Sequence, residues 1–91
     1  MIREQIKIFK HYGYKHQLHK LVEEMRELEA VIINDPDNTE HIQEEMADVL
    51  NLIDQFMYCC PQWAMNVYKI KEFKVQRQIE RMEKEQWMAN T

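Results

Sequence analysis

Apolar residues recur at helical spacing along two stretches of the chain that share one pattern. The first stretch carries Leu21, Met25, Leu28 and Ile32, and the second, twenty-one residues later, carries Ile42, Met46, Val49 and Ile53. At roughly 100° per residue, each set falls on one face of a helix. The pattern therefore predicts two amphipathic helices whose apolar faces form the core.

Residues typical of helix ends separate four predicted helices. Gly13 can take the left-handed conformation that stops a helix, and the turn-forming segment 34–38 separates two longer helices. Asp37, with Glu40 three positions later, has the form of a capping box, and Pro61 suits the first turn of the last helix. The helices are expected at about residues 2–11 and 14–34, from the 34–38 turn to about 58, and at about 61–88. The short turn makes the two central helices antiparallel neighbours.

Composition supports an all-α fold. The chain has one glycine and two prolines among 91 residues, and it is rich in Glu, Lys, Gln, Met and Leu, which favour helices. A chain of this length is expected to form a single domain, residues 1–91, that buries only about two-thirds of its extended surface. We therefore expect a four-helix bundle that homo-oligomerisation completes.

Charge and hydropathy argue against several classes of partner. The net charge of −4 disfavours a general surface for nucleic acid or for an anionic membrane. No apolar run approaches the length of a membrane span, and the first residues do not resemble a secretory signal. The two cysteines, Cys59 and Cys60, are neighbours whose disulfide would be strained. These features predict a cytoplasmic protein with reduced thiols.

A pair of carboxylates accompanies the first apolar stripe. With Leu21 as the origin, Glu24 lies at about −60° and Glu27 at about −120°, so both flank the predicted core. Glu23 falls at about 200° and turns to water. A single acidic pair of this kind is usually a solvated helix face.

The second stripe repeats the arrangement with Glu45 and Asp48, while Glu44 turns away. Two antiparallel helices would thus direct four carboxylates to one place, which is how a protein holds a hard cation such as Mg²⁺. Without a cation, such a cluster would suffer like-charge repulsion. A di-iron bundle would require Glu-x-x-His pairs, and no histidine lies three residues after a glutamate. The pattern favours Mg²⁺, with Mn²⁺ also possible.

The last predicted helix has two distinct faces. One line runs through Trp63, Val67 and Ile70 and then becomes basic at Lys74, Arg77 and Arg81. A second apolar strip gathers on another side of the helix from Tyr68, Val75, Ile79 and Met82. A small monomer would struggle to cover this strip, which suggests a subunit interface.

The acidic segments also resemble a known family. The run from Glu23 to Glu27, about seventeen intervening residues, and the run from Glu45 to Asp48 resemble the Glu-Glu-x-x-Glu … Glu-x-x-Asp signature of the MazG-like, all-α nucleoside triphosphate pyrophosphohydrolases. The resemblance covers most of the chain and includes Tyr12-Gly13, Gln17, Lys20-Leu21, Lys74, Arg77 and Arg81. It implies a MazG-like four-helix bundle that forms a homodimer or homotetramer and serves in nucleotide pool sanitation.

The resemblance also implies a reaction and roles for residues. In that family four acids bind Mg²⁺, and water attacks a nucleoside triphosphate between its α and β phosphates to yield the monophosphate and pyrophosphate. The implied metal ligands are Glu24, Glu27, Glu45 and Asp48; the implied catalytic residues are Glu24 and Lys74; the implied substrate-binding residues are Gln17, Lys74, Arg77 and Arg81. Gln78 departs from relatives that carry asparagine one turn after the lysine.

Each of these roles has a plainer alternative. The basic trio is also typical of solvated decoration near a helix C-terminus. The residues His11, Tyr12, Tyr14 and His16 either contact a base or pack at a helix junction. His41, one turn before Glu45, is either a neighbour of the metal site or a surface residue. The rival to the enzyme hypothesis is a catalytically silent helical interaction module whose second apolar strip recruits a partner.

Overall fold

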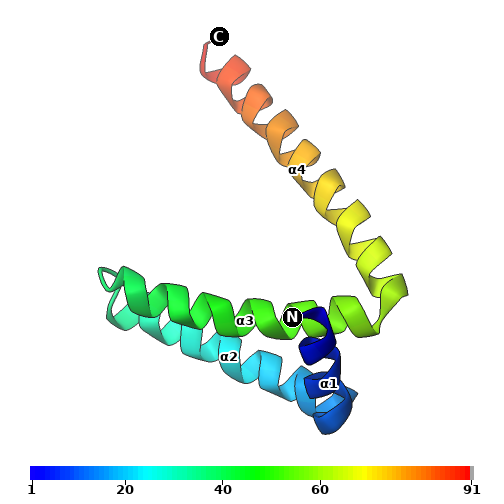
Figure 1. Cartoon of the computed structure of the whole chain (residues 1–91). Helices are drawn as coiled ribbons and strands as arrows, with labels where there is room; N and C mark the ends of the chain where they lie inside the picture. The colour runs from blue at the N-terminus through cyan, green and yellow to red at the C-terminus, as the bar shows by residue number, and fades with distance from the viewer. Residues whose placement is uncertain (91) are drawn as a thin grey trace. The chain divides into compact units, whose positions relative to one another are not determined.

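The computed structural model describes residues 1–90, and within that range the chain is helical with no strand. Its helices are α1 (Ile2–Tyr12), α2 (Tyr14–Asn34), α3 (Thr39–Cys59) and α4 (Pro61–Ala89), labelled in Figure 1. The all-α prediction is confirmed, and the helix ends lie close to the predicted ones. The chain divides into two compact units, of which Met1–Pro61 holds α1, α2 and α3, and the second is formed by the remainder of α4. A single domain over residues 1–91 stays a prediction.

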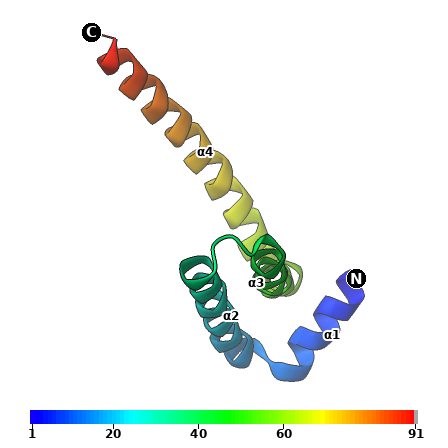
Figure 2. The same ribbon diagram turned by 90° about the vertical axis from the view of Figure 1, so that its left-hand side faces the viewer.

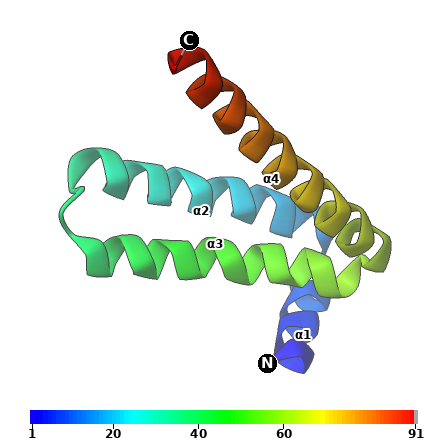
Figure 3. The ribbon, with the colours of Figure 1, turned by 90° about the horizontal axis from the view of Figure 1, so that it is seen from above.

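In the first unit, α2 and α3 run antiparallel and side by side, as the sequence predicted (Figures 1 and 3). The turn between Asn34 and Thr39 joins them. α1 and α2 diverge from their junction, and α1 contacts both of the longer helices (Figure 2). This arrangement places the start of α2, the end of α3 and most of α1 around one region of the unit.

Gly13 is the junction between α1 and α2. Its φ of 91° and ψ of 162° lie in a region that residues with a Cβ rarely adopt. Its N–H donates to the carbonyl of Phe9 and thereby closes the end of α1. The prediction that Gly13 stops the first helix is therefore confirmed.

The N-terminus of α3 corrects one prediction. The residue that caps α3 is Asn38, whose Oδ1 accepts from the N–H of His41 at 3.1 Å, and not Asp37. The Nδ2 of Asn38 also donates to Asp35, which fixes the turn from the other side. Asn38 therefore serves both the cap and the turn, whereas Asp37 and Glu40 do not form the predicted box.

The interface between α2 and α3 is shifted toward the acidic flank. Leu52 and Phe56 of α3 are buried, whereas Met25 and Met46 of the two apolar stripes each leave 45 % of their surface exposed. Glu24 is buried instead, with 8 % exposed. The expectation that both methionines lie in the core is thus wrong for a single protomer, because the helices meet along a line between the stripe and the acids.

Aromatic rings complete the core where the three helices meet. The ring of Phe56 makes edge contacts with Phe9 of α1, at 5.1 Å between centroids, and with Tyr14 of α2, at 5.8 Å. Edge-to-face contacts of this kind add to the stabilisation from apolar burial. This aromatic cluster holds α1 in place beside the longer helices.

In the second unit, α4 is a 29-residue helix in which no described residue is buried. Among its large apolar side chains, between 42 % and 64 % of the surface is exposed at Met65, Tyr68, Val75, Ile79 and Met82. No helix within residues 1–90 has both the length and the apolar content that a transmembrane span requires.

Candidate metal centre

Three carboxylates from α2 and α3 gather at one point. Glu24 and Glu27 come from α2 and Glu45 from α3, and one oxygen of each lies within 4.8 Å of the others. Spacing of three residues places the two α2 acids on neighbouring turns of one face, as predicted. The antiparallel packing then brings Glu45 against them from the opposite helix.

Two oxygens of this cluster have no partner. Across residues 1–90, no hydrogen-bond donor reaches the buried Oε2 of Glu24 or the buried Oε2 of Glu45. A buried carboxylate oxygen without a donor or a cation is costly, because it has lost its hydration and gained nothing in return. The two oxygens come from opposite helices, so one ion between the helices could satisfy both.

The electrostatics of Glu24 reflect this crowding. Burial raises the pKa of Glu24 above its ordinary value of 4.5, and contact with Glu27 and the charge of Asp48 raise it further. Lys20 opposes this effect through its ion pair with Glu24 at 3.5 Å. Burial and the neighbouring acids together thus outweigh the lowering of the pKa of Glu24 by Lys20. A divalent cation would reverse this balance, because it favours the charged form of each ligand.

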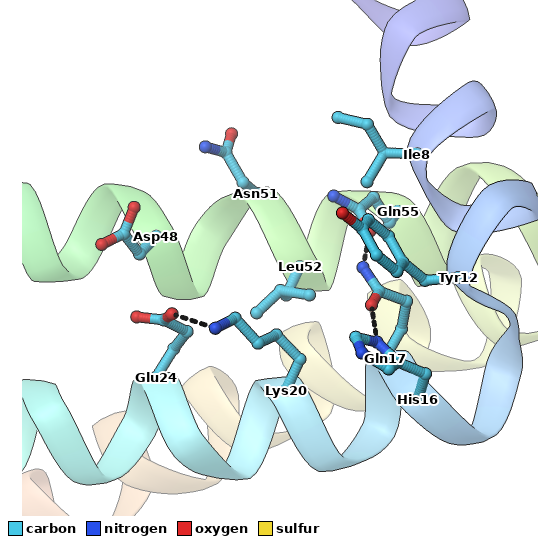
Figure 4. Close-up of a pocket in the computed structure, with 10 residues that line it drawn as sticks. All are labelled: Ile8, Tyr12, His16, Gln17, Lys20, Glu24, Asp48, Asn51, Leu52 and Gln55. Atoms are coloured by element: carbon cyan, nitrogen blue, oxygen red, sulfur yellow. Dashed lines mark hydrogen bonds and ion pairs between the residues drawn. The ribbon is translucent and has the colours of Figure 1, made fainter.

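Asp48 lies next to the cluster without being part of its closest set. Its side chain is exposed, and it lines the same pocket as Glu24 from the opposite helix (Figure 4). Its role as a fourth ligand stays a prediction. Glu23 and Glu44 are both exposed, as their helical phase predicted.

Two basic side chains touch the acids one turn away. Lys20 contacts Glu23 at 3.3 Å as well as Glu24, and His41 Nε2 lies 3.3 Å from Glu45 Oε1. The structure therefore places His41 at the edge of the acidic cluster. Lys20 was noticed in the sequence only as part of the family resemblance, although an i, i+4 Lys–Glu pair is a sufficient signal for its contact.

A pocket of about 420 Å³ opens beside the carboxylates (Figure 4). Its volume lies within the usual range for small-molecule sites. Its lining comes from all three helices of the first unit and consists of Ile8, Tyr12, His16, Gln17, Lys20, Glu24, Asp48, Asn51, Leu52 and Gln55. A ligand in this pocket would therefore contact Glu24 and Asp48 at one end and neutral amides and rings at the other.

The amides form one directed chain of hydrogen bonds. Gln17 Nε2 donates to Gln55 Oε1 at 2.7 Å, Gln55 Nε2 donates to Gln5 Oε1 at 2.9 Å, and Gln5 Nε2 donates to Asn51 Oδ1 at 3.0 Å. The three glutamines are buried, with 3–8 % of their surface exposed. Their hydrogen bonds satisfy amides that would otherwise be unpaired in the interior.

The chain also fixes a histidine. His16 Nδ1 lies 2.8 Å from Gln17 Oε1, and an amide oxygen only accepts, so Nδ1 donates and carries a proton. The ring of Tyr12 stacks on that of His16 with centroids 4.7 Å apart and planes inclined by 18°. Tyr12 is 53 % exposed, so much of its surface is open to a ligand. The pocket thus contains an aromatic surface beside oriented polar groups.

Sequence reasoning identified Gln17 but missed Gln5, Asn51 and Gln55. Gln17 lies on the helical flank that leads to Glu24, and Gln55 and Asn51 continue the flank of Asp48 at about −140° and 180° from Ile42. Extending the two acidic flanks by two turns would have found them. Gln5 has no such signal, because its burial depends on how α1 packs.

The basic residues of α4 belong to the second unit. Lys74, Arg77 and Arg81 are exposed, and Arg77 stacks over the ring of Phe73 at 5.7 Å. Their predicted contacts with substrate stay predictions.

Comparison with protein-family models, with curated proteins and with solved structures returns no match.

Proposed function

We propose that the protein is a Mg²⁺-dependent nucleoside triphosphate pyrophosphohydrolase of the MazG-like type. The observation that carries the proposal is the pair of buried, unpartnered oxygens on Glu24 and Glu45, which come from opposite helices and share a cluster with Glu27. Mg²⁺ prefers oxygen ligands and usually binds through a few carboxylates together with substrate phosphates. An acidic cluster at one end of an open pocket suits that mode of binding.

The proposed site residues would bind different parts of the substrate. Glu24, Glu27, Glu45 and Asp48 would hold the cation, and a bound divalent cation supplies charge neutralisation on the phosphates and lowers the pKa of a water. Gln17, together with Tyr12 and His16, would contact the nucleobase in the pocket. The remaining proposed phosphate contacts are Lys74, Arg77 and Arg81.

Two residues are proposed to act on the reaction itself. Glu24 belongs to the acidic cluster and lines the pocket, so its carboxylate is placed to take the proton of an attacking water. Lys74 would stabilise the negative charge that develops on the phosphates. The products would be a nucleoside monophosphate and pyrophosphate, in keeping with a role in nucleotide pool sanitation in the cytoplasm.

The alternative is a helical interaction module without activity. The observation that favours it is α4, in which no described residue is buried and many large apolar side chains are exposed. The same helix also suits the proposed homodimer or homotetramer, and hydrolysis of a nucleotide distinguishes the module from the enzyme.

Metal binding is tested first without any substrate. We expect Mg²⁺ or Mn²⁺ to raise the melting temperature, because a ligand that binds only the folded state stabilises it by about 2.7 kcal/mol at a hundredfold excess over its Kd. Glu45→Gln should abolish the shift, and the matched exposed variant Glu44→Gln should retain it. An unchanged melting temperature in the wild type, or equal shifts in both variants, would refute the metal centre.

Activity is then tested on a panel of canonical and damaged (deoxy)nucleoside triphosphates. We expect release of pyrophosphate, with no orthophosphate, from some members of the panel in the presence of Mg²⁺ and none in EDTA. A protein that binds Mg²⁺ but hydrolyses no member of the panel would favour the interaction module.

A further inference from the structure

One side of α4 carries a seam of residues spaced alternately three and four apart. The seam runs over about three and a half heptads. Alternate spacing of three and four residues lets two helices pack side by side. It consists of Met65, Tyr68, Glu72, Val75, Ile79, Met82, Gln86 and Ala89. Five of these side chains are large and apolar, and each is between 42 % and 64 % exposed. A lone helix in water gains little stability from its own hydrogen bonds, so this seam calls for a partner.

The charges beside the seam are divided along the length of the helix. Lys69 and Lys71 flank its first half, whereas Glu83 and Glu85 flank its second half. All four are exposed, and none makes an ion pair within residues 1–90. Lys71 Nζ lies 5.3 Å from the ring of Tyr68, on the seam side of the helix. A seam whose flanking positions are basic beside one half and acidic beside the other is complementary to a reversed copy of itself.

We propose that α4 pairs antiparallel with α4 of a second copy of this chain, about a two-fold axis level with Arg77. In that register Lys69 faces Glu83 of the second copy and Lys71 faces Glu85 of the second copy. The two-fold axis repeats both pairs, so four opposite-charge contacts form. At the centre, Gln76 and Gln78 each meet the same residue of the second copy, so no like charges are opposed.

The seam itself agrees with this register. Val75 faces Ile79 of the second copy, so the middle of the contact is apolar. The two polar seam residues avoid each other, because Glu72 faces Met82 and Gln86 faces Tyr68. Tyr and Met can cover the stems of these longer side chains while their polar ends reach water.

The parallel alternative lacks these features. If the two helices were parallel and in register, Glu72 would lie directly opposite Glu72 of the second copy, inside the seam. Flanking residues five apart would then face each other, pairing Lys71 with Gln76 and Gln78 with Glu83, so no opposite charges would meet. The pattern therefore selects both a second copy and its direction. Lys74, Arg77 and Arg81 lie outside the seam and stay accessible in the pair.

Charge reversal tests the pairing in the full chain. The double variants Lys69→Glu/Lys71→Glu and Glu83→Lys/Glu85→Lys each turn four attractive contacts into repulsive ones. We expect each alone to dimerise at least about tenfold more weakly than the wild type in sedimentation equilibrium. Mixed together, the two variants should form a heterodimer, because every facing pair is then again of opposite charge. Circular dichroism at 222 nm checks that α4 stays helical.

Cross-linking tests the direction independently. In a chain whose Cys59 and Cys60 are replaced by serine, we expect Gln78→Cys to form a disulfide with itself across the two-fold axis. Lys84→Cys, which lies on the outer side of α4 and far from the axis, should form none. A parallel pair would separate the two copies of residue 78 and leave both variants uncross-linked.

Three results would overturn the proposal. They are a wild-type chain that is monomeric at tens of micromolar, charge-reversed variants that do not recombine, and equal cross-linking at positions 78 and 84. None of these measurements depends on Mg²⁺ or on nucleotide hydrolysis. The pairing of α4 and the proposed enzymatic activity can thus succeed or fail separately.

Discussion

Gln17 of α2 donates a hydrogen bond of 2.7 Å to Gln55 of α3, and both side chains are almost fully buried. Glutamine is seldom enclosed in this way, because its amide loses water on both of its polar atoms. Here the bond is one link in the chain from His16 to Asn51, which connects all three helices of the first unit. The wall of the pocket and the packing of the helices therefore depend on the same contacts.

The chain of amides predicts a large effect of one substitution. Gln55→Leu removes the acceptor of Gln17 Nε2 and the donor to Gln5 Oε1, and so leaves one polar atom on each of two buried amides without a partner. Each unsatisfied group costs about 1–3 kcal/mol, so the free energy of unfolding should fall by at least about 2 kcal/mol in urea denaturation. Gln43→Leu, on an exposed face of the same helix, should change it by less than about 0.5 kcal/mol. Equal effects would mean that the buried bonds contribute nothing.

Glu24 makes the metal-free protein less stable as the pH rises. Its pKa is raised above 4.5, so between 4.5 and the raised value the folded state binds more protons than the unfolded state. The free energy of unfolding therefore falls as the pH increases through this window. Urea denaturation in EDTA, begun below pH 4.5, should show this fall in the wild type and in Glu23→Gln but not in Glu24→Gln. If the free energy of unfolding also falls in Glu24→Gln, another titrating group causes the fall.

Amide substitutions separate metal ligands from their neighbours. Glu27→Gln and Asp48→Asn should weaken Mg²⁺ binding, measured by calorimetry, by more than the roughly 10–100-fold typical of losing an outer partner. Helical content should stay unchanged, because the amide has nearly the volume of the acid. Glu23→Gln should bind Mg²⁺ as the wild type does. If Asp48→Asn also binds normally, the centre has three carboxylate ligands and not four.

The cap of α3 can be measured by two adjacent substitutions. Asn38→Ala removes the acceptor of the His41 N–H and should lower the free energy of unfolding by about 1 kcal/mol. Asp37→Ala should have little effect, because Asp37 does not cap the helix. If Asp37→Ala lowers the thermal stability more than Asn38→Ala does, the capping box predicted from the sequence is correct.

Local patterns in the sequence predicted most of this architecture. Periodicity located the helices, and the phase of Glu24, Glu27 and Glu45 located the acidic cluster, because both depend only on the geometry of one helix. The burial of Gln5, Gln17 and Gln55 was not predictable in the same way. It depends on which flanks face each other across three helices, and a polar residue carries no periodic signal that it will be enclosed.

The failure at Met25 and Met46 has the same origin. Helical phase places a residue on a face but does not say where along that face the neighbouring helix will pack. The roles of Lys74, Arg77 and Arg81 were likewise inferred from their alignment on one helix. The alignment of charges on a helix does not identify the group that they bind.

The bend at Gly13 depends on the chirality of the residue at this position. No atom lies within 4 Å of the place that a Cβ would occupy, so space does not exclude a side chain there. Only the backbone does, because a φ of 91° suits the mirror image of an ordinary residue. A D-alanine at this position would keep the bend between α1 and α2, whereas L-alanine would strain it by about 1–3 kcal/mol. Since Ile8 and Tyr12 line the pocket from α1, the chirality of a single residue determines where one wall of the pocket lies, at the end away from the carboxylates (Figure 4).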